Sequence, residues 1–299
     1  MKMRCRSPAP AHPAPAPFAQ QCAAGFGPTL ILALIASTAY AAAPERIVSL
    51  APHLTELAFT AGAGDRIVAT VEYSNHPDAA RSIPRIGDAF RVDLERLLAL
   101  RPDVVLVWDS GTPAPTVERI RALKLSVVSF QTHRLEHVAT VLREIGRLAG
   151  TSEVAERAAA DYERSIQELR ERYRDRTPLS VFIEVDDRPL YTVNGQHIMS
   201  EIVELCGGRN VFADLNALAP AIGIEAVIAA NPQAIISTDD TVPDAAAVWG
   251  RWRHIEAVRT GNVYTLRSDD IARATTRLTV AAEAVCRTLD TARQRMPKH

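Results

Sequence analysis

The sequence is poor in cysteine and lacks the short motifs that mark common enzymes. Its 299 residues include 4 cysteines, and no CxxC pair, Walker loop, HExxH or GxSxG motif occurs. Gly62-Ala63-Gly64 lacks the third glycine of a dinucleotide-binding turn. The sequence therefore shows no activated nucleophile, phosphate loop or zinc site, and we expect a protein that is not an enzyme.

An excess of positive charge and a long hydrophobic run are also missing. Lys and Arg number 34 against 35 Asp and Glu, and the basic residues are scattered among acids. This balance excludes a nucleic-acid-binding surface. The apolar run at residues 30–36 is too short to span a bilayer as a mature helix.

Residues 1–43 differ in composition from the rest of the chain. Their only charged side chains are basic and lie at the start; a Pro/Ala-rich run, the apolar run and the small residues STAYAAA follow. This order predicts a secretory signal peptide cleaved after Ala41 or Ala43. Cys206 and Cys286 remain in the exported chain. An even pair favours a disulfide, with two free buried thiols as the alternative.

The rest of the chain contains two similar α/β halves. In residues 44–150, short apolar strands alternate with helices, which indicates a parallel sheet covered on both faces. Residues 178–299 repeat this organisation. The clearest echo pairs LERLLALRPDVVL, which begins at Leu94, with IEAVIAANPQAII, which begins at Ile224. The predicted fold class is α/β, with two Rossmann-like lobes that each contain a parallel sheet.

One long helix is expected to join the lobes. Residues 152–176 carry an apolar stripe at a spacing of three to four residues, starting at Val154, with no glycine or proline. A helix of that length measures about 37 Å. We interpret residues 151–177 as a rigid strut that limits lobe motion; an ordinary surface helix is the alternative.

Ligands of open α/β sheets bind outside the carboxyl ends of the strands, so two facing lobes predict a cleft between them. Tyr73 and Trp108 follow predicted strands there. Their rings suit a flat or large, partly apolar ligand, although Trp108 could instead pack in the core. Three loop histidines could form a metal or haem site. The pairs Asp186-Asp187 and Asp239-Asp240 could be paired carboxylates for acid–base chemistry. Isolated polar loop residues are the alternative for these histidines and acids: His53, His76, His133, Asp186, Asp187, Asp239 and Asp240.

Glu95 and Glu225 occupy the same position in the two repeats, each at an exposed helix start. Compensation of the helix dipole explains each of them alone. A partner with two-fold symmetry would also require one such charge on each lobe.

Stretches that run nearly from end to end identify a family resemblance: RIVSLAPHLTELAFTAG, YSNHP, DLERLLALRPDVVLVW, VELCGGRNVF, IEAVIAANPQAII and SDDIARATTR. The chain resembles the class III periplasmic substrate-binding proteins, which have two lobes and a rigid helix and feed ABC importers of vitamin B12, haem and ferric siderophores. The match is closest to the members that bind vitamin B12.

The resemblance implies a monomeric periplasmic protein that captures cobalamin or another corrinoid between its lobes. It would deliver this transported ligand, which is not an intrinsic cofactor, to an ABC permease and ATPase complex in the inner membrane. The resemblance places four residues at the corrinoid pocket: Tyr73, Trp108, Asp269 and Arg273. It places Glu95 and Glu225 against arginines of the permease. It pairs Cys206 with Cys286 in the family's disulfide.

The chain departs from the family at three pocket positions. Ala89 and Ala219 stand where tryptophans are expected, and Asp270 replaces an aromatic residue, with Phe90 a neighbouring candidate to compensate. A haem or ferric-siderophore receptor of the same fold is therefore the alternative function. A periplasmic enzyme that uses the Asp pairs is a third possibility.

Overall fold

The computed structural model describes residues 43–297 except 89 and 241. The predicted signal peptide, apart from Ala43, and the pocket position Ala89 lie outside the described residues. Within the described part of the chain, no helix combines the length and the apolar character that crossing a membrane requires.

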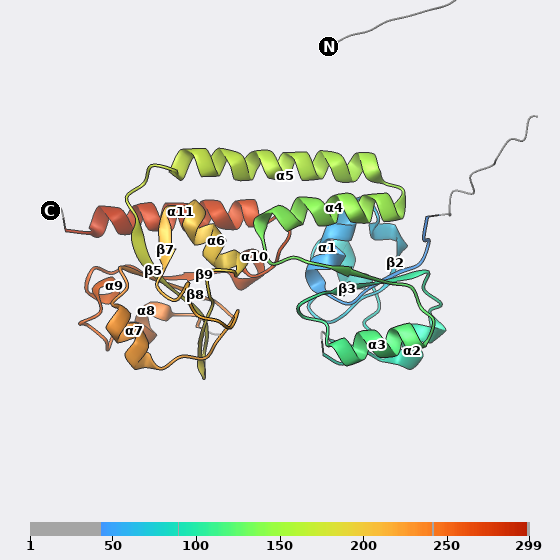
Figure 1. Ribbon diagram of the computed structural model, residues 1–299, viewed down its shortest axis with the longest axis horizontal. Helices are drawn as coiled ribbons and strands as arrows, with labels where there is room; N and C mark the ends of the chain where they lie inside the picture. Colours follow the sequence, from blue (N-terminus) through green and yellow to red (C-terminus); the bar gives the residue numbers. More distant parts are fainter. Residues whose placement is uncertain (1–42, 89, 241, 298–299) are drawn as a thin grey trace, which may run out of the picture. The chain divides into compact units, whose positions relative to one another are not determined.

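The first lobe is a four-stranded parallel sheet in the order β2-β1-β3-β4, with helices on both faces (Figure 1). Alternate residues of β3 point to opposite faces. Leu106 packs in the core under α1 and α4, and Val105 packs with Ile120 of α3. The elements of this lobe are β1 (Ile47–Ser49), α1 (Pro52–Thr60), η1 (Gly64–Arg66), β2 (Ile67–Ala69), η2 (Asp78–Ser82), α2 (Leu94–Ala99), β3 (Val104–Trp108), α3 (Ala114–Ala122), β4 (Val127–Phe130) and α4 (Leu135–Ala149).

The second lobe has a five-stranded sheet in the order β6-β5-β8-β9, with β7 also paired to β5. Strand β6 runs antiparallel to β5, whereas the other pairings are parallel. The sequence predicts neither β6 nor β7. The elements are β5 (Leu179–Asp187), β6 (Leu190–Thr192), α6 (Ile198–Leu205), β7 (Gly208–Asn210), α7 (Ile224–Ala230), β8 (Ala234–Thr238), α8 (Ala245–Trp249), α9 (Glu256–Arg259), β9 (Val263–Leu266), α10 (Ser268–Ile271) and α11 (Leu278–Arg295).

The sequence repeat is a structural repeat. Helix α2 leads into β3 in the first lobe, as α7 leads into β8 in the second. Both connections turn through a non-glycine residue in the left-handed region, at Arg101 (φ 45°) and Asn231 (φ 42°). The prediction of two similar α/β lobes is confirmed.

Helix α5 (Ser152–Tyr173) contacts α1 and α4 of the first lobe and α6 and α11 of the second (Figure 1). Its buried stripe begins at Ala155 rather than at the predicted Val154, which is 40% exposed. The reason is a close approach to α4, where a Cβ at Gly146 would lie 2.3 Å from the Ala155 methyl group. The helix also ends earlier than expected, at Tyr173.

The predicted disulfide is confirmed. Cys206 follows α6 and bonds to Cys286 of α11 with an S–S length of 2.03 Å. Both residues are fully buried. The bond ties together two helices that share the core beneath α5.

Candidate functional site

The loop after β2 is held by hydrogen bonds and presents one aromatic ring to solvent. The buried Ser74 hydroxyl lies 2.8 Å from the Thr70 hydroxyl, and Arg85 donates to the Ser74 carbonyl oxygen at 2.7 Å. Tyr73 has a φ of 65°, a left-handed conformation that is rare for tyrosine. Its side chain is 75% exposed. A strained backbone that presents a ring to solvent is typical of a binding loop.

A second exposed aromatic ring stands on the neighbouring loop. The Glu72 amide donates to the Gly87 carbonyl oxygen at 2.8 Å, which joins the two loops. Asp88 Oδ1 accepts from the amides of Phe90 and Arg91, each at 2.7 Å, and closes the turn that carries Phe90. Phe90 is 73% exposed. Two large exposed rings on joined loops favour a ligand surface.

Trp108, at the carboxyl end of β3, lies over a buried histidine. His53 contacts its ring edge-on at a centroid distance of 5.1 Å and places Nε2 3.2 Å from the Thr132 hydroxyl. Burial, and then the charge of Arg273, lowers the pKa of His53 to about 3. The imidazole is therefore neutral at physiological pH. The Trp108 ring also covers Gly111, where a Cβ would lie 1.7 Å from ring carbon Cε3.

Asn75 joins the first lobe to two predicted ligand residues of the second. Arg273 Nη1 donates to Asn75 Oδ1 at 2.7 Å, and Asn75 Nδ2 donates to Asp269 Oδ2 at 3.3 Å. Asp269 and Arg273 form an ion pair at 2.5 Å. The structure therefore brings Asp269 and Arg273 together at Asn75, which lies two residues after Tyr73 in the chain.

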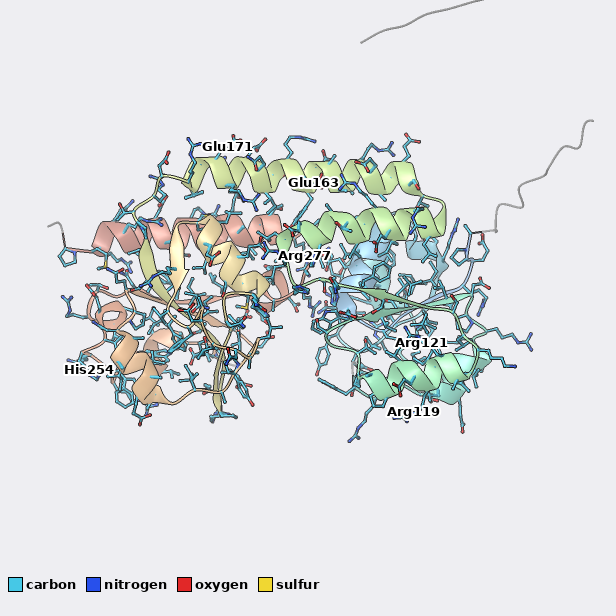
Figure 2. The ribbon with its side chains drawn as sticks, viewed as in Figure 1. Arg119, Arg121, Glu163, Glu171, His254 and Arg277 are labelled. Carbon is cyan, nitrogen blue, oxygen red and sulfur yellow. A yellow bond between two sulfur atoms is a disulfide. The ribbon has the colours of Figure 1, made fainter. Side chains whose placement is uncertain are left out.

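A second link between the lobes is ionic. Arg277 donates through Nε and Nη2 to the two carboxylate oxygens of Glu56, each at 2.9 Å, and through Nη1 to Asp270 at 2.6 Å. Figure 2 marks Arg277 at this position. The Glu56 side chain is only 3% exposed, and its hydrogen bond raises the pKa of Arg277. We call the residues of both links the lobe seam: Glu56, Asn75, Asp269, Asp270, Arg273 and Arg277.

Sequence reasoning predicted no contact for Glu56, Asn75 or Arg277, although Asn75 lies in a loop that follows a predicted strand. Each makes its contact with a residue about 200 positions away, and local patterns carry no information on such pairs. All three also lie inside the stretches that carry the family resemblance. Those stretches do not distinguish pocket residues from their supports.

The two repeated glutamates lie where the sequence predicts. Glu95 and Glu225 are exposed in the first turns of α2 and α7. Neither forms an ion pair with any residue that the structure describes. Figure 1 shows α2 and α7 on the sides of their lobes that face away from α5.

The histidines and Asp pairs are spread over separate environments. His53 is buried, His76 is exposed, and His133 contacts His137 at a centroid distance of 4.7 Å. Among the described residues, no group of three or more His, Cys, Asp or Glu side chains could hold a metal ion. Asp186 accepts the amide hydrogen of Asp187 in its own turn, and Asp239 accepts the amide hydrogen of Ser268, which follows β9.

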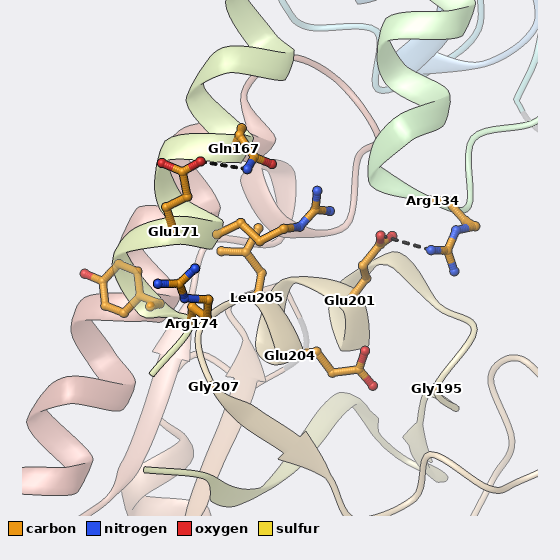
Figure 3. A pocket seen from close by; sticks show the side chains of 11 residues that line it. Arg134, Gln167, Glu171, Arg174, Gly195, Glu201, Glu204, Leu205 and Gly207 are labelled. Carbon is orange, nitrogen blue, oxygen red and sulfur yellow. Dashed lines mark hydrogen bonds and ion pairs between the residues drawn. The ribbon is translucent and has the colours of Figure 1, made fainter. Parts of the chain in front are cut away.

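The described residues also line hollows away from these loops. One of about 570 Å³ lies between α5 and α6, where Glu201 points toward Arg134 and Gln167 bonds to Glu171 (Figure 3). Another of about 650 Å³ lies beside Trp249. The predicted ligand residues Tyr73, Asp269 and Arg273 line neither. Trp108 lines a third hollow, of about 480 Å³.

Comparison with known proteins assigns the chain to a family. The model of the family described as periplasmic binding protein matches residues 47–269. The vitamin B12-binding protein of Vibrio cholerae serotype O1 is 34% identical over 243 residues, which cover 81% of this chain and 88% of that protein. Its counterpart in Pectobacterium atrosepticum is 34% identical over 260 residues, with coverages of 85% and 91%.

Solved structures agree with these matches. The periplasmic vitamin B12 binding protein of Vibrio cholerae superposes with a TM-score of 0.79 at 34% identity, over 84% of this chain and 98% of that chain. A periplasmic heme-binding protein from Roseiflexus sp. RS-1 gives 0.74 at 24% identity, over 83% and 98%, and supports the fold alone. The predicted fold and the prediction of a binding protein without enzymatic activity are confirmed, and the chain belongs to the periplasmic binding protein family.

Proposed function

We propose that the protein captures cobalamin between its two lobes and delivers it to an ABC importer. The observation that carries the proposal is the 34% identity to proteins named for vitamin B12 binding, which extends through both lobes. Residues 1–43 would serve as the signal peptide of a monomer that acts in the periplasm. The match to a heme-binding protein, at 24% identity, supports the fold and carries no argument for haem.

The exposed rings suit such a ligand. A corrin macrocycle presents broad, partly apolar faces and a periphery of carboxamides. Tyr73 and Phe90 would cover the apolar faces of the macrocycle. Trp108, which packs on His53, would close the inner end of the pocket. The exposed edges of Asp269 and Arg273 would bind peripheral amides. Ala219 is exposed and adds no ring, so this pocket would be wider than one lined by tryptophan there.

Delivery requires a docking surface, and we assign it to Glu95 and Glu225. Their exposure and their equivalent positions in the two lobes fit a permease with one basic site for each lobe. Replacing both with alanine should weaken binding to the permease complex and leave ligand affinity unchanged. Lost ligand affinity with intact docking would contradict the assignment.

Calorimetric titration tests the ligand. The chain that begins at Ala42 is titrated in parallel with cyanocobalamin, cobinamide, hemin and a ferric siderophore. One-to-one binding of cyanocobalamin, weakened by Trp108→Ala, is expected. If hemin or the siderophore gives binding heat and cyanocobalamin gives none, the proposed transport role stands but cobalamin is not the ligand.

A further inference from the structure

The arginines of the lobe seam are already engaged by protein groups. Arg273 uses Nη1 for Asn75 and Nη2 for Asp269. Arg277 uses Nη1 for Asp270 and its other two nitrogens for Glu56. A carboxylate on a ligand binds best to a guanidinium that can offer a bidentate pair of donors. Arg277 therefore has no free nitrogen, and Arg273 keeps only Nε without a partner among the described residues.

Acceptors at the same place are accessible. The side chains of Asp269 and Asp270 are 33% and 25% exposed. The seam holds three carboxylates and two arginines. A third arginine, Arg267, approaches Asp270 only at 3.6 Å and is itself 73% exposed. Its charge is therefore strongly screened by water. The accessible face of the seam thus offers carboxylate oxygens that, beside their present partners, can accept further hydrogen bonds.

We propose that the lobe seam selects ligands whose periphery carries neutral carboxamides and rejects those that carry ionised carboxylates, with Asp269 and Asp270 as the specificity-determining residues. The inference rests on the proposed function and deepens it. A carboxamide N–H can donate to an aspartate oxygen, while its carbonyl accepts from the edge of Arg273. A carboxylate has no proton to donate and places like charges side by side, which is unfavourable when water is excluded.

The seam also accounts for Asp270 at a position where the family resemblance predicts an aromatic residue. The Asp270 carboxylate accepts a hydrogen bond from Nη1 of Arg277. In our proposal this nitrogen would otherwise be free to donate to the ligand. Asn75 acts as a positioning residue, because its amide holds Arg273 and Asp269 in one arrangement.

The test compares cyanocobalamin with its three monocarboxylic acid derivatives, each with one peripheral amide hydrolysed, by calorimetry at pH 7. In the wild-type protein we expect at least one acid to bind more than about fivefold weaker than the amide, as like-charge contacts require. Asp269→Asn or Asp270→Asn should lower the ratio of the dissociation constant of the acid to that of cyanocobalamin by about twofold or more, because each variant removes one repelling charge. Asp65→Asn, which removes an exposed charge in η1, is the matched control and should leave the ratio unchanged.

Two results would overturn the inference and leave the proposed function intact. If cyanocobalamin binds and all three acids bind within about fivefold of it, the seam does not discriminate and the cobalamin function stands. If the acids bind weakly but neither aspartate variant changes the ratio, the discrimination originates elsewhere. Absence of cyanocobalamin binding by the wild-type protein would refute the proposed function itself, and this inference with it. Urea unfolding followed by circular dichroism shows whether each variant is folded, whatever its affinity for cyanocobalamin.

Discussion

Replacing Arg277 with methionine should destabilise the protein strongly, because it leaves a buried charge unpaired. Glu56 is 3% exposed, and both of its carboxylate oxygens accept from Arg277 at 2.9 Å. Removing one partner of such a buried pair typically costs about 3–5 kcal/mol. Native proteins have only about 5–15 kcal/mol of total stability, so the effect is easily measured. The assay is urea unfolding at pH 7, followed by circular dichroism.

An exposed ion pair provides the control. Arg164 and Asp161 also form a close pair, but their side chains are 63% and 69% exposed. Arg164→Met should therefore cost no more than about 1 kcal/mol. A double variant that also carries Glu56→Gln should recover part of the loss, because the buried charge is then gone. A loss below about 1 kcal/mol for Arg277→Met would show that water reaches Glu56 and would refute the reasoning.

Three further predictions follow from strain, protonation and the disulfide. Tyr73→Gly and Lys124→Gly (native φ values of 65° and 62°) should each stabilise the fold by about 1 kcal/mol in urea, whereas only Tyr73→Gly should weaken cobalamin binding; unchanged binding would show that the ring is not used. The folded-state pKa of His53, about 3, lies below its unfolded value of 6.5, so stability is present above pH 6.5 and lost as pH falls toward 3. His53→Gln should reduce the loss between pH 7 and pH 5 by about 2 kcal/mol, and identical pH profiles would contradict the assignment of a neutral histidine. Replacing Cys206 and Cys286 with alanine opens a loop of 80 residues and should cost roughly 4 to 5 kcal/mol in chemical unfolding; a change in stability below about 1 kcal/mol would contradict this estimate.

The lobes and their central helix were predictable because local patterns determine them. Strands β3 and β4 begin and end where the sequence predicts, since each is a mostly apolar run bounded by polar residues. The repeated sequence that carries Glu95 and Glu225 predicts α2 and α7 without any information on tertiary contacts. The short elements β6, β7, α9 and α10 were missed. They contain three or four residues and depend on tertiary partners rather than on periodicity.

The candidate site was predictable in part. Tyr73 and Trp108 were predicted as residues at strand ends, and in the structure Tyr73 is exposed while Trp108 packs against His53. The bonds that orient the site were not predictable. In the sequence, Glu56 is a single acidic residue in a short helix, and nothing nearby indicates its partner. Only the tertiary fold brings Arg277 into contact with it. The start of the α5 stripe was misplaced for a similar reason, because a close contact with Gly146 determines which alanine is buried.

The most direct test of the central claim is to locate the metal of bound cobalamin. Crystals of the complex would be measured at the cobalt absorption edge, and an anomalous difference map would mark the cobalt atom. We predict one peak between the lobes, bounded by Tyr73, Trp108 and Arg273. A peak in the hollow beside Trp249, or in the one between α5 and α6, would contradict the account and move the site away from the lobe seam.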